Sequence, residues 1–262
     1  MTAQKWSLFL DFDGTLVDIA PQPDAVVVDA GLVPMLRVLQ DELDGCLAMV
    51  SGRSLATLDR FLAPLAFDAA GMHGLEYRLG GTTVRCDPAT RPELGVALEK
   101  VTRTLGEIGG VVIEDKGCAF SVHWREAPLA EKGALLTLTE TLKVLGGDYR
   151  LQLGKCVGEI IPMEASKGHA LASFLKHAKY EGRRPIFIGD DLTDEDGFRV
   201  INDADGISIH VGHLQTVAQH RIASPTKVRS LLARWSSGGD MGALEGSGLS
   251  DTAVAAISHP KK

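Results

Sequence analysis

The sequence predicts an α/β fold: a Rossmann-like, doubly wound parallel sheet forms the core, and an α+β cap domain is inserted into it. Apolar runs of strand length alternate with segments of helical period in the first third of the chain and again in the last third. In the middle third, strand-like runs are joined by short glycine turns, which indicates antiparallel pairing. Because the alternating pattern returns after the middle third, we expect both outer thirds to share one sheet.

The expected elements follow in chain order. The first third has strands at 6–11, 47–50 and 68–74, with helices at 33–43 and 55–62. The middle third has a hairpin at 76–86 turning at Gly80-Gly81, helices at 94–108 and 129–145, and strands at 111–114, 119–124, 149–153 and 157–161. The last third has strands at 185–188 and 206–211, with helices at 167–178 and 228–235.

These elements predict a domain division. Residues 1–80 and 163–235 are expected to form the core domain, and residues 81–162 the inserted cap. After Trp235 the composition shifts to serine, glycine and aspartate with few apolar residues, so we expect a flexible tail over 236–262.

Composition excludes several classes of function. The 262 residues carry a net charge of −7, which argues against nucleic acid as a partner. No apolar run approaches the roughly 18 residues of a membrane span, and the N-terminus has no signal-peptide pattern. We therefore expect a cytoplasmic protein with no membrane partner, and a monomer, because no extra interface segment is evident.

The four cysteines give a further expectation. Cys46, Cys86, Cys118 and Cys156 form no C-x-x-C pair, which argues against a structural zinc site. Their wide spacing predicts free thiols in a reducing compartment, acting as small buried apolar residues.

The strongest chemical signal is Asp11-Phe12-Asp13-Gly14-Thr15 at the end of a predicted strand. Ligands bind at the carboxyl ends of strands in open α/β sheets. Two carboxylates this close repel each other unless a cation holds them. The pattern favours one aspartate as nucleophile and the other as acid/base, with Mg²⁺ neutralising the cluster. The alternative is a solvated Asp-Gly turn.

A second acidic run, Gly189 to Asp196, also follows a predicted strand. A helix N-terminus accounts for its last acids, because carboxylates suit the helix dipole there. It does not account for Asp190 and Asp191, directly at the strand end. These acids and Asp11 can face one crevice if their strands are neighbours, which a doubly wound sheet permits.

Two weaker motifs complete the set. Ser51, Gly52 and Arg53 follow a strand, where a hydroxyl and helix-start amides make a phosphate cradle; an N-cap serine is the alternative. Lys167 opens a helix after the inserted module, where it can neutralise a phosphoryl oxygen; a solvated lysine is the alternative.

Taken in order, Asp-x-Asp-Gly-Thr, Ser, Lys and Gly-Asp-Asp resemble the haloacid dehalogenase superfamily of aspartate-nucleophile phosphatases. The resemblance extends over residues 6–235 to the trehalose-6-phosphate phosphatases. It is carried by the motifs Asp11-Phe-Asp-Gly-Thr-Leu-Val-Asp18, Val50-Ser-Gly-Arg-Ser54, Gly71-Met-His-Gly74, Lys116-Gly117, Ser121-Val-His-Trp-Arg125, Gly154-Lys-Cys-Val-Gly-Glu-Ile160 and Gly189-Asp-Asp-Leu-Thr-Asp-Glu195.

The resemblance implies a role for each matching residue. Asp11 would be the nucleophile and Asp13 the general acid/base. Mg²⁺ would be held by Asp11, the main-chain carbonyl of Asp13, and Asp190. Ser51 and Lys167 would hold the transferring phosphoryl group. Asp191 and Asp194 would support the metal site and Lys167.

The cap would read the sugar of trehalose 6-phosphate. The resemblance implies that substrate-binding residues are Gly52, Arg53, His73, Lys116, His123, Arg125 and Glu159. Without the resemblance, the charged cap residues are surface charges on a small sheet. His73, at the crossover from core to cap, is a candidate for substrate contact or for a hinge, and a buried structural histidine is the equal alternative. The family commonly has a basic residue and a glycine between Glu159 and Lys167, whereas this chain has Ile160-Ile-Pro-Met-Glu-Ala-Ser166.

Two other functions stay open on the sequence. One is a phosphatase for another sugar phosphate, such as sucrose 6-phosphate, because the core residues do not distinguish the sugars. The other is a catalytically silent sugar-phosphate sensor, which would be expected to have lost Asp11, Asp13 or Asp190; all three are present.

Overall fold

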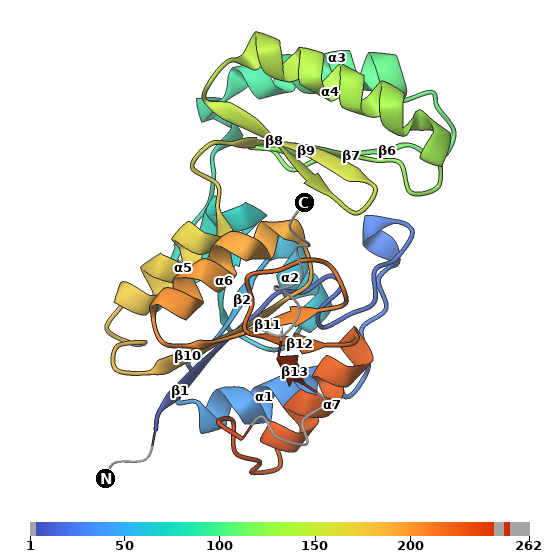
Figure 1. The fold of residues 1–262 in the computed structure, drawn as a ribbon. Coiled ribbons are helices and arrows are strands. Elements are labelled where there is room, and N and C mark those ends of the chain that lie inside the picture. The colour runs from blue at the N-terminus through green and yellow to red at the C-terminus, as the bar shows by residue number, and fades with distance from the viewer. Residues whose placement is uncertain (1–3, 244–248, 252–262) are drawn as a thin grey trace, which may run out of the picture.

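The computed structural model describes residues 4–243 and 249–251, which form two sheets with helices packed on them (Figure 1). The larger sheet lies in the lower part of Figure 1, and the smaller one lies above it with its helices on the far side. This is the predicted core with an inserted cap.

In the described residues the larger sheet has nine strands. In sheet order they are β13 (Ser250–Asp251), β12 (His220–Ile222), β11 (Ile207–Val211), β10 (Arg184–Gly189), β1 (Trp6–Leu10), β2 (Leu47–Val50), β3 (Asp68–Gly71), β4 (Glu76–Leu79) and β5 (Thr82–Val84). The pairs from β12 through to β3 are parallel, while β13, β4 and β5 pair antiparallel. Both outer thirds therefore contribute to one sheet, as predicted.

Helices cover both faces of this sheet. On one face α1 (Leu32–Glu42) contacts α7 (Pro225–Trp235), and on the other α5 (Lys167–Lys176) packs beside α6 (Glu195–Asp203). The fifth helix of the core, α2 (Leu55–Leu62), packs on β3. Residues 7–10 of β1 are fully buried, as expected for a central strand covered on both faces.

The smaller sheet has the strand order β6 (Val112–Asp115), β7 (Phe120–His123), β9 (Val157–Pro162) and β8 (Tyr149–Gly154), all antiparallel. Two helices, α3 (Pro92–Leu105) and α4 (Glu131–Leu145), cover its outer face. Val101, Phe120, Leu138 and Ile160 are fully or almost fully buried between helices and sheet. The inner face of the smaller sheet carries no helices in the described part of the chain and faces the larger sheet.

The predicted hairpin is present, with its turn at Gly80-Gly81, and both of its strands belong to the larger sheet. β5 therefore lies in the core sheet beyond the predicted boundary between residues 80 and 81. The chain crosses to the cap after Val84 and returns between β9 and α5. A small apolar cluster that includes Met72, Cys118, Ile161 and Ala165 packs where the two crossings meet.

The prediction of four free thiols is wrong. Cys86 and Cys118 form a disulfide, with Cα atoms 6.2 Å apart. The crossing after β5 runs beside the turn between β6 and β7, and this brings together two cysteines separated by 32 residues. Cys46 is a buried free thiol, as predicted, whereas Cys156 is exposed.

Some elements lack a clear sequence signal. The helix α6, the short strands β12 and β13, and the 3-10 helices η1 (Pro23–Ala25), η2 (Met72–Gly74), η3 (Pro88–Thr90), η4 (Pro128–Ala130) and η5 (Leu192–Asp194) were not predicted. Part of the predicted tail lies outside the described residues. Its described part contacts the core: Met241 is buried, and Ser250–Asp251 pairs with β12. No helix in the described residues has the length and apolar character of a membrane span.

Candidate active site

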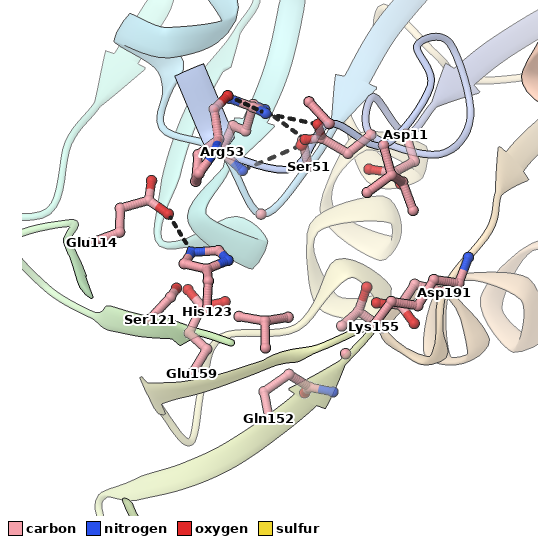
Figure 2. A pocket seen from close by; sticks show the side chains of 18 of the residues that line it. Asp11, Ser51, Arg53, Glu114, Ser121, His123, Gln152, Lys155, Glu159 and Asp191 are labelled. Carbon is pink, nitrogen blue, oxygen red and sulfur yellow. Dashed lines mark hydrogen bonds and ion pairs between the residues drawn. The ribbon is translucent and has the colours of Figure 1, made fainter. Parts of the chain in front are cut away.

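The carboxyl ends of three adjacent strands meet beneath the cap. β1 lies between β2 and β10, so Asp11, Ser51 and Asp190 follow neighbouring strands. All three are buried and line one cavity between the core and the cap sheet (Figure 2). The expectation that both acidic strand ends share one crevice is confirmed.

Lys167 lies at the centre of the buried charges. Its Nζ is 2.9 Å from Asp11 Oδ1 and 2.8 Å from Asp194 Oδ1. The Ser166 side chain caps α5, which places Lys167 at the first helical residue. Burial disfavours the ammonium, but the two carboxylates dominate and raise the pKa of Lys167 above its usual range. Lys167 is therefore a fixed positive charge.

Carboxylate oxygens of Asp11, Asp190 and Asp194 lie within 4.8 Å of one another. Asp194 is already engaged, because its Oδ2 accepts the backbone N–H groups of Asp190 and Asp191 at 2.9 and 3.0 Å. Burial is the main cause that raises the pKa of Asp190 to about 6, and the negative charge of Asp194 is the second. Burial also raises the pKa of Asp11. Crowded hard oxygen donors of this kind fit a divalent metal ion.

The backbone of the turn after β1 packs directly against the Asp190 carboxylate. Gly14 has φ +74°, and a Cβ at this position would lie 2.2 Å from Asp190 Oδ2. Glycine is needed there both for the left-handed backbone and for the close approach of the carboxylate.

Asp13 is held by Arg53. The guanidinium donates from Nε to Asp13 Oδ2 at 2.5 Å and from Nη2 to Oδ1 at 2.7 Å. Arg53 also lies over the rings of Phe12 and Phe61. A bidentate and stacked arginine fixes the direction of the carboxylate it binds. In this structure Arg53 therefore contacts the predicted acid/base.

Ser51 and Gly52 follow β2 and line the cavity. The Ser51 hydroxyl accepts the Arg53 backbone N–H at 3.2 Å. The Gly52 carbonyl accepts Lys116 Nζ, also at 3.2 Å, which links the core to the cap. A Cβ on Gly52 would lie 2.8 Å from His73 Nε2, so a larger residue would displace the histidine.

A buried network joins His73, Glu159 and Lys116. Glu159 accepts Lys116 Nζ at 2.8 Å on Oε1, and its Oε2 lies 3.2 Å from His73 Nε2. Although burial opposes ionisation, Lys116 and His73 hold the pKa of Glu159 well below its usual range. The network joins the cap strand β9 to the core at η2.

The two other predicted cap residues lie further along the same face. His123 Nε2 is 3.1 Å from Glu114 Oε2. Arg125 donates to the Ala20 carbonyl of the core and, at 2.8 Å, to the Lys155 carbonyl of the cap. Arg125 is therefore a polar link between the two parts, and the structure brings both residues to the cavity.

Asp191 lies beside the cap turn rather than beside Lys167. Asp191 and Asp194 form a capping box at the start of η5. A Cβ on Gly154, in the β8–β9 turn, would come within 2.9 Å of Asp191 Oδ2. Contact with Lys167 comes from Asp194, through the 2.8 Å bond described above.

Sequence reasoning did not single out several polar residues that line the cavity, among them Glu114, Ser121, Gln152 and Lys155. Ser121 and Gln152 lie between apolar neighbours on their strands, and this period of two was the available signal, whereas Glu114 is followed by Asp115. Lys155 lies in a turn motif quoted for the resemblance, and its Nζ lies 2.5 Å from Asp190 Oδ2.

The fold and these residues define a phosphatase of the haloacid dehalogenase class. An aspartate at the end of the central strand lies against a buried lysine, a second carboxylate follows two residues later, and an acidic cluster and a cap complete the cavity. Such an enzyme is a phosphoric monoester hydrolase.

A family model described as trehalose-phosphatase matches residues 9–230. The chain belongs to this family. It is 42% identical over 231 residues to the trehalose-6-phosphate phosphatase of Escherichia coli strain K12, covering 87% of this chain and 85% of the relative. It is also 42% identical over 208 residues to a probable trehalose-phosphate phosphatase of Sinorhizobium fredii, covering 79% and 78%.

A solved structure agrees with this assignment. The crystal structure of a trehalose-6-phosphate phosphatase related protein matches with a TM-score of 0.73 at 29% identity, covering 88% of this chain and 96% of the other. The likeness includes both the core and the cap, and it confirms the predicted fold class.

Proposed function

We propose that this enzyme hydrolyses trehalose 6-phosphate to trehalose and phosphate, with Asp11 as nucleophile and Mg²⁺ as the metal. The observation that supports it most directly is the buried Asp11 carboxylate, 2.9 Å from Lys167 and close to Asp190, beneath a polar cap face. The family relation supports a sugar phosphate as the substrate.

In the first step an Asp11 oxygen attacks phosphorus, and the sugar oxygen leaves. Lys167 and Ser51 hold the equatorial phosphoryl oxygens, where negative charge develops. Asp11, the Asp13 main-chain carbonyl and Asp190 would hold Mg²⁺, which supplies further positive charge to those oxygens. Gly52 and Arg53 extend the phosphate cradle.

Asp13 carries the protons. It gives one to the departing sugar oxygen and then takes one from the water that hydrolyses the aspartyl-phosphate. Both Asp13 oxygens accept bonds from Arg53, which holds the Asp13 side chain in one orientation.

The cap supplies sugar recognition in this proposal. Lys116, His123 and Arg125 donate to sugar hydroxyls, and Glu159 accepts from them. His73 holds Glu159 from the core side, at 3.2 Å. Polar links between core and cap, from Lys155 to Asp190, from His73 to Glu159 and from Lys116 to the Gly52 carbonyl, support a closed arrangement that excludes water from the acyl-phosphate.

The test is phosphate release from a panel of sugar phosphates, with Mg²⁺ and with a chelator. Release from trehalose 6-phosphate that stops with chelator, and that is lost in Asp11→Asn, is the expected result. A tenfold preference for sucrose 6-phosphate, about 1.4 kcal/mol, would overturn the substrate assignment and keep the chemistry. Tight binding without release would indicate a sensor.

The remaining expectations are a cytoplasmic monomer and an independent cap domain at 81–162, of which β5 (Thr82–Val84) belongs to the core sheet. Sedimentation of the purified protein tests the oligomeric state, because a monomer sediments with the mass of a single chain at every concentration. Separate expression of residues 81–162 tests whether the cap folds alone.

A further inference from the structure

The inner face of the cap sheet carries one row of polar side chains that crosses all four strands. Register pairs Glu114 with Ser121, Ser121 with Glu159, and Glu159 with Gln152. Directly opposed residues of an antiparallel pair point to the same face. All four line the cavity, and Figure 2 shows them gathered below Asp11 and Ser51.

The neighbouring positions confirm which face this is. Val122, Ile160 and Leu151, each one residue along from a member of the row, pack into the apolar cluster under the cap helices. The row therefore faces the core. Since strands lie about 4.8 Å apart, it is about 14 Å long, which is enough for more than one sugar ring.

The two acids of the row already have partners. Glu159 is engaged by Lys116 and His73, and Glu114 by His123. The two neutral members are different. The Ser121 hydroxyl is fully buried and has no hydrogen-bond partner among the described residues. A buried hydroxyl without a partner is costly, so a ligand that completes it is the simplest explanation.

Gln152 presents the complementary group. Its carbonyl oxygen accepts a bond from Arg150, and within the described part of the chain no bond is found to its amide nitrogen. The amide N–H₂ is therefore the half that can donate into the cavity. Ser121 and Gln152 lie on either side of Glu159 and together offer a hydroxyl and two N–H donors.

We infer that Ser121 and Gln152 are specificity-determining residues that bind hydroxyl groups of the sugar ring that carries no phosphate. This inference rests on the proposed function. The phosphate lies at Asp11 on the core side, and the row lies on the opposite wall, so a second ring extending from the phosphorylated one would meet the row. Neutral groups suit this ring, because it carries no charge.

The experiment compares Ser121→Ala and Gln152→Met on three substrates: trehalose 6-phosphate, glucose 6-phosphate and p-nitrophenyl phosphate. Each variant is expected to raise KM for trehalose 6-phosphate about three- to tenfold, the loss of one neutral hydrogen bond. Glucose 6-phosphate and p-nitrophenyl phosphate lack the second ring, so their kcat/KM should stay within about twofold of wild type.

Ser7→Ala is the matched control. The Ser7 hydroxyl is also fully buried without a partner in the described residues, but Ser7 lies within β1 and does not line the cavity. Its removal should leave every KM unchanged. Calorimetric binding of trehalose to each variant gives a second readout, and weaker binding is expected for Ser121→Ala and Gln152→Met alone.

Three outcomes overturn the inference: an unchanged KM for trehalose 6-phosphate, a parallel loss on all three substrates, or an equal effect on glucose 6-phosphate. The wild-type panel separates this from the proposed function. If the wild type prefers another disaccharide phosphate, the proposed function fails, and the same KM comparison with that substrate decides the role of the row.

Discussion

The ammonium group of Lys155, on the cap, lies 2.5 Å from a carboxylate oxygen of Asp190, on the core. Asp190 is buried, and Lys155 reaches it from the turn between β8 and β9. This ion pair ties the cap to a proposed metal ligand. A divalent cation at the acidic cluster and the Lys155 ammonium therefore compete for one oxygen.

We predict that Lys155→Met binds Mg²⁺ more tightly than wild type, by about fivefold, because the competing cation is gone. Titration calorimetry of the metal-free protein measures this directly, without turnover. Lys143→Met is the control, since Lys143 pairs with the exposed Glu140 on α4 and does not line the cavity. Equal Mg²⁺ affinity in wild type and Lys155→Met would show that no competition occurs.

Replacement of Arg53 by Met should lower kcat at least about tenfold, because Asp13 loses the two bonds that orient it. Arg60→Met is a close control. Arg60 also lies over the Phe61 ring, but its carboxylate partner, Asp24, is an exposed surface residue. Steady-state kinetics with trehalose 6-phosphate compares them, and an equal loss in both variants would assign the effect to packing on Phe61.

Glu159 predicts a pH dependence of stability. Its pKa is lowered in the folded protein, so its ionisation stabilises the fold above its ordinary pKa of 4.5 and contributes less as the pH falls below it. Glu159→Gln should cost about 3 kcal/mol at pH 7, because Lys116 loses its buried partner. The difference should shrink by pH 3. Thermal midpoints at both pH values measure it, and a constant difference would contradict this origin.

The disulfide predicts a response to reductant. The link closes a loop between residues separated by 32 positions, which restricts the unfolded chain and stabilises the fold by about 3 kcal/mol. Dithiothreitol should lower the thermal midpoint of the wild type to that of Cys86→Ser/Cys118→Ser. The double variant itself should not respond. If dithiothreitol lowers the thermal midpoint of the double variant as much as that of wild type, the effect does not come from this disulfide.

Much of the fold could be predicted, because strong periodicity identifies elements one at a time. The apolar runs before Asp11, Ser51 and Asp190 located three strand ends, and parallel strands bring their ends to one edge. The strand β12 was missed because its three residues, His-Arg-Ile, carry no apolar alternation. The acids that open α6 indicated a helix start, but no helix was assigned over the residues that follow them.

The partners within the site could not be predicted in the same way. His73 and Glu159 are 86 positions apart, and their contact exists only when the cap lies on the core. The Cys86–Cys118 bond likewise depends on how the crossing after β5 passes the β6–β7 turn. Such pairings depend on tertiary approach, about which local sequence patterns carry no information.

The proposed catalytic residues and the polar row lie on different sheets, so substitutions in one sheet need not change the other. The residues proposed for phosphoryl transfer lie at the ends of core strands and at the start of α5, whereas the polar row lies wholly on cap strands. The chain passes into the cap after Val84 and returns to the core before Lys167, so both ends of the cap attach to one side of the core. Evolution or an engineer could therefore exchange the segment as a cassette and acquire a new substrate without rebuilding the chemistry.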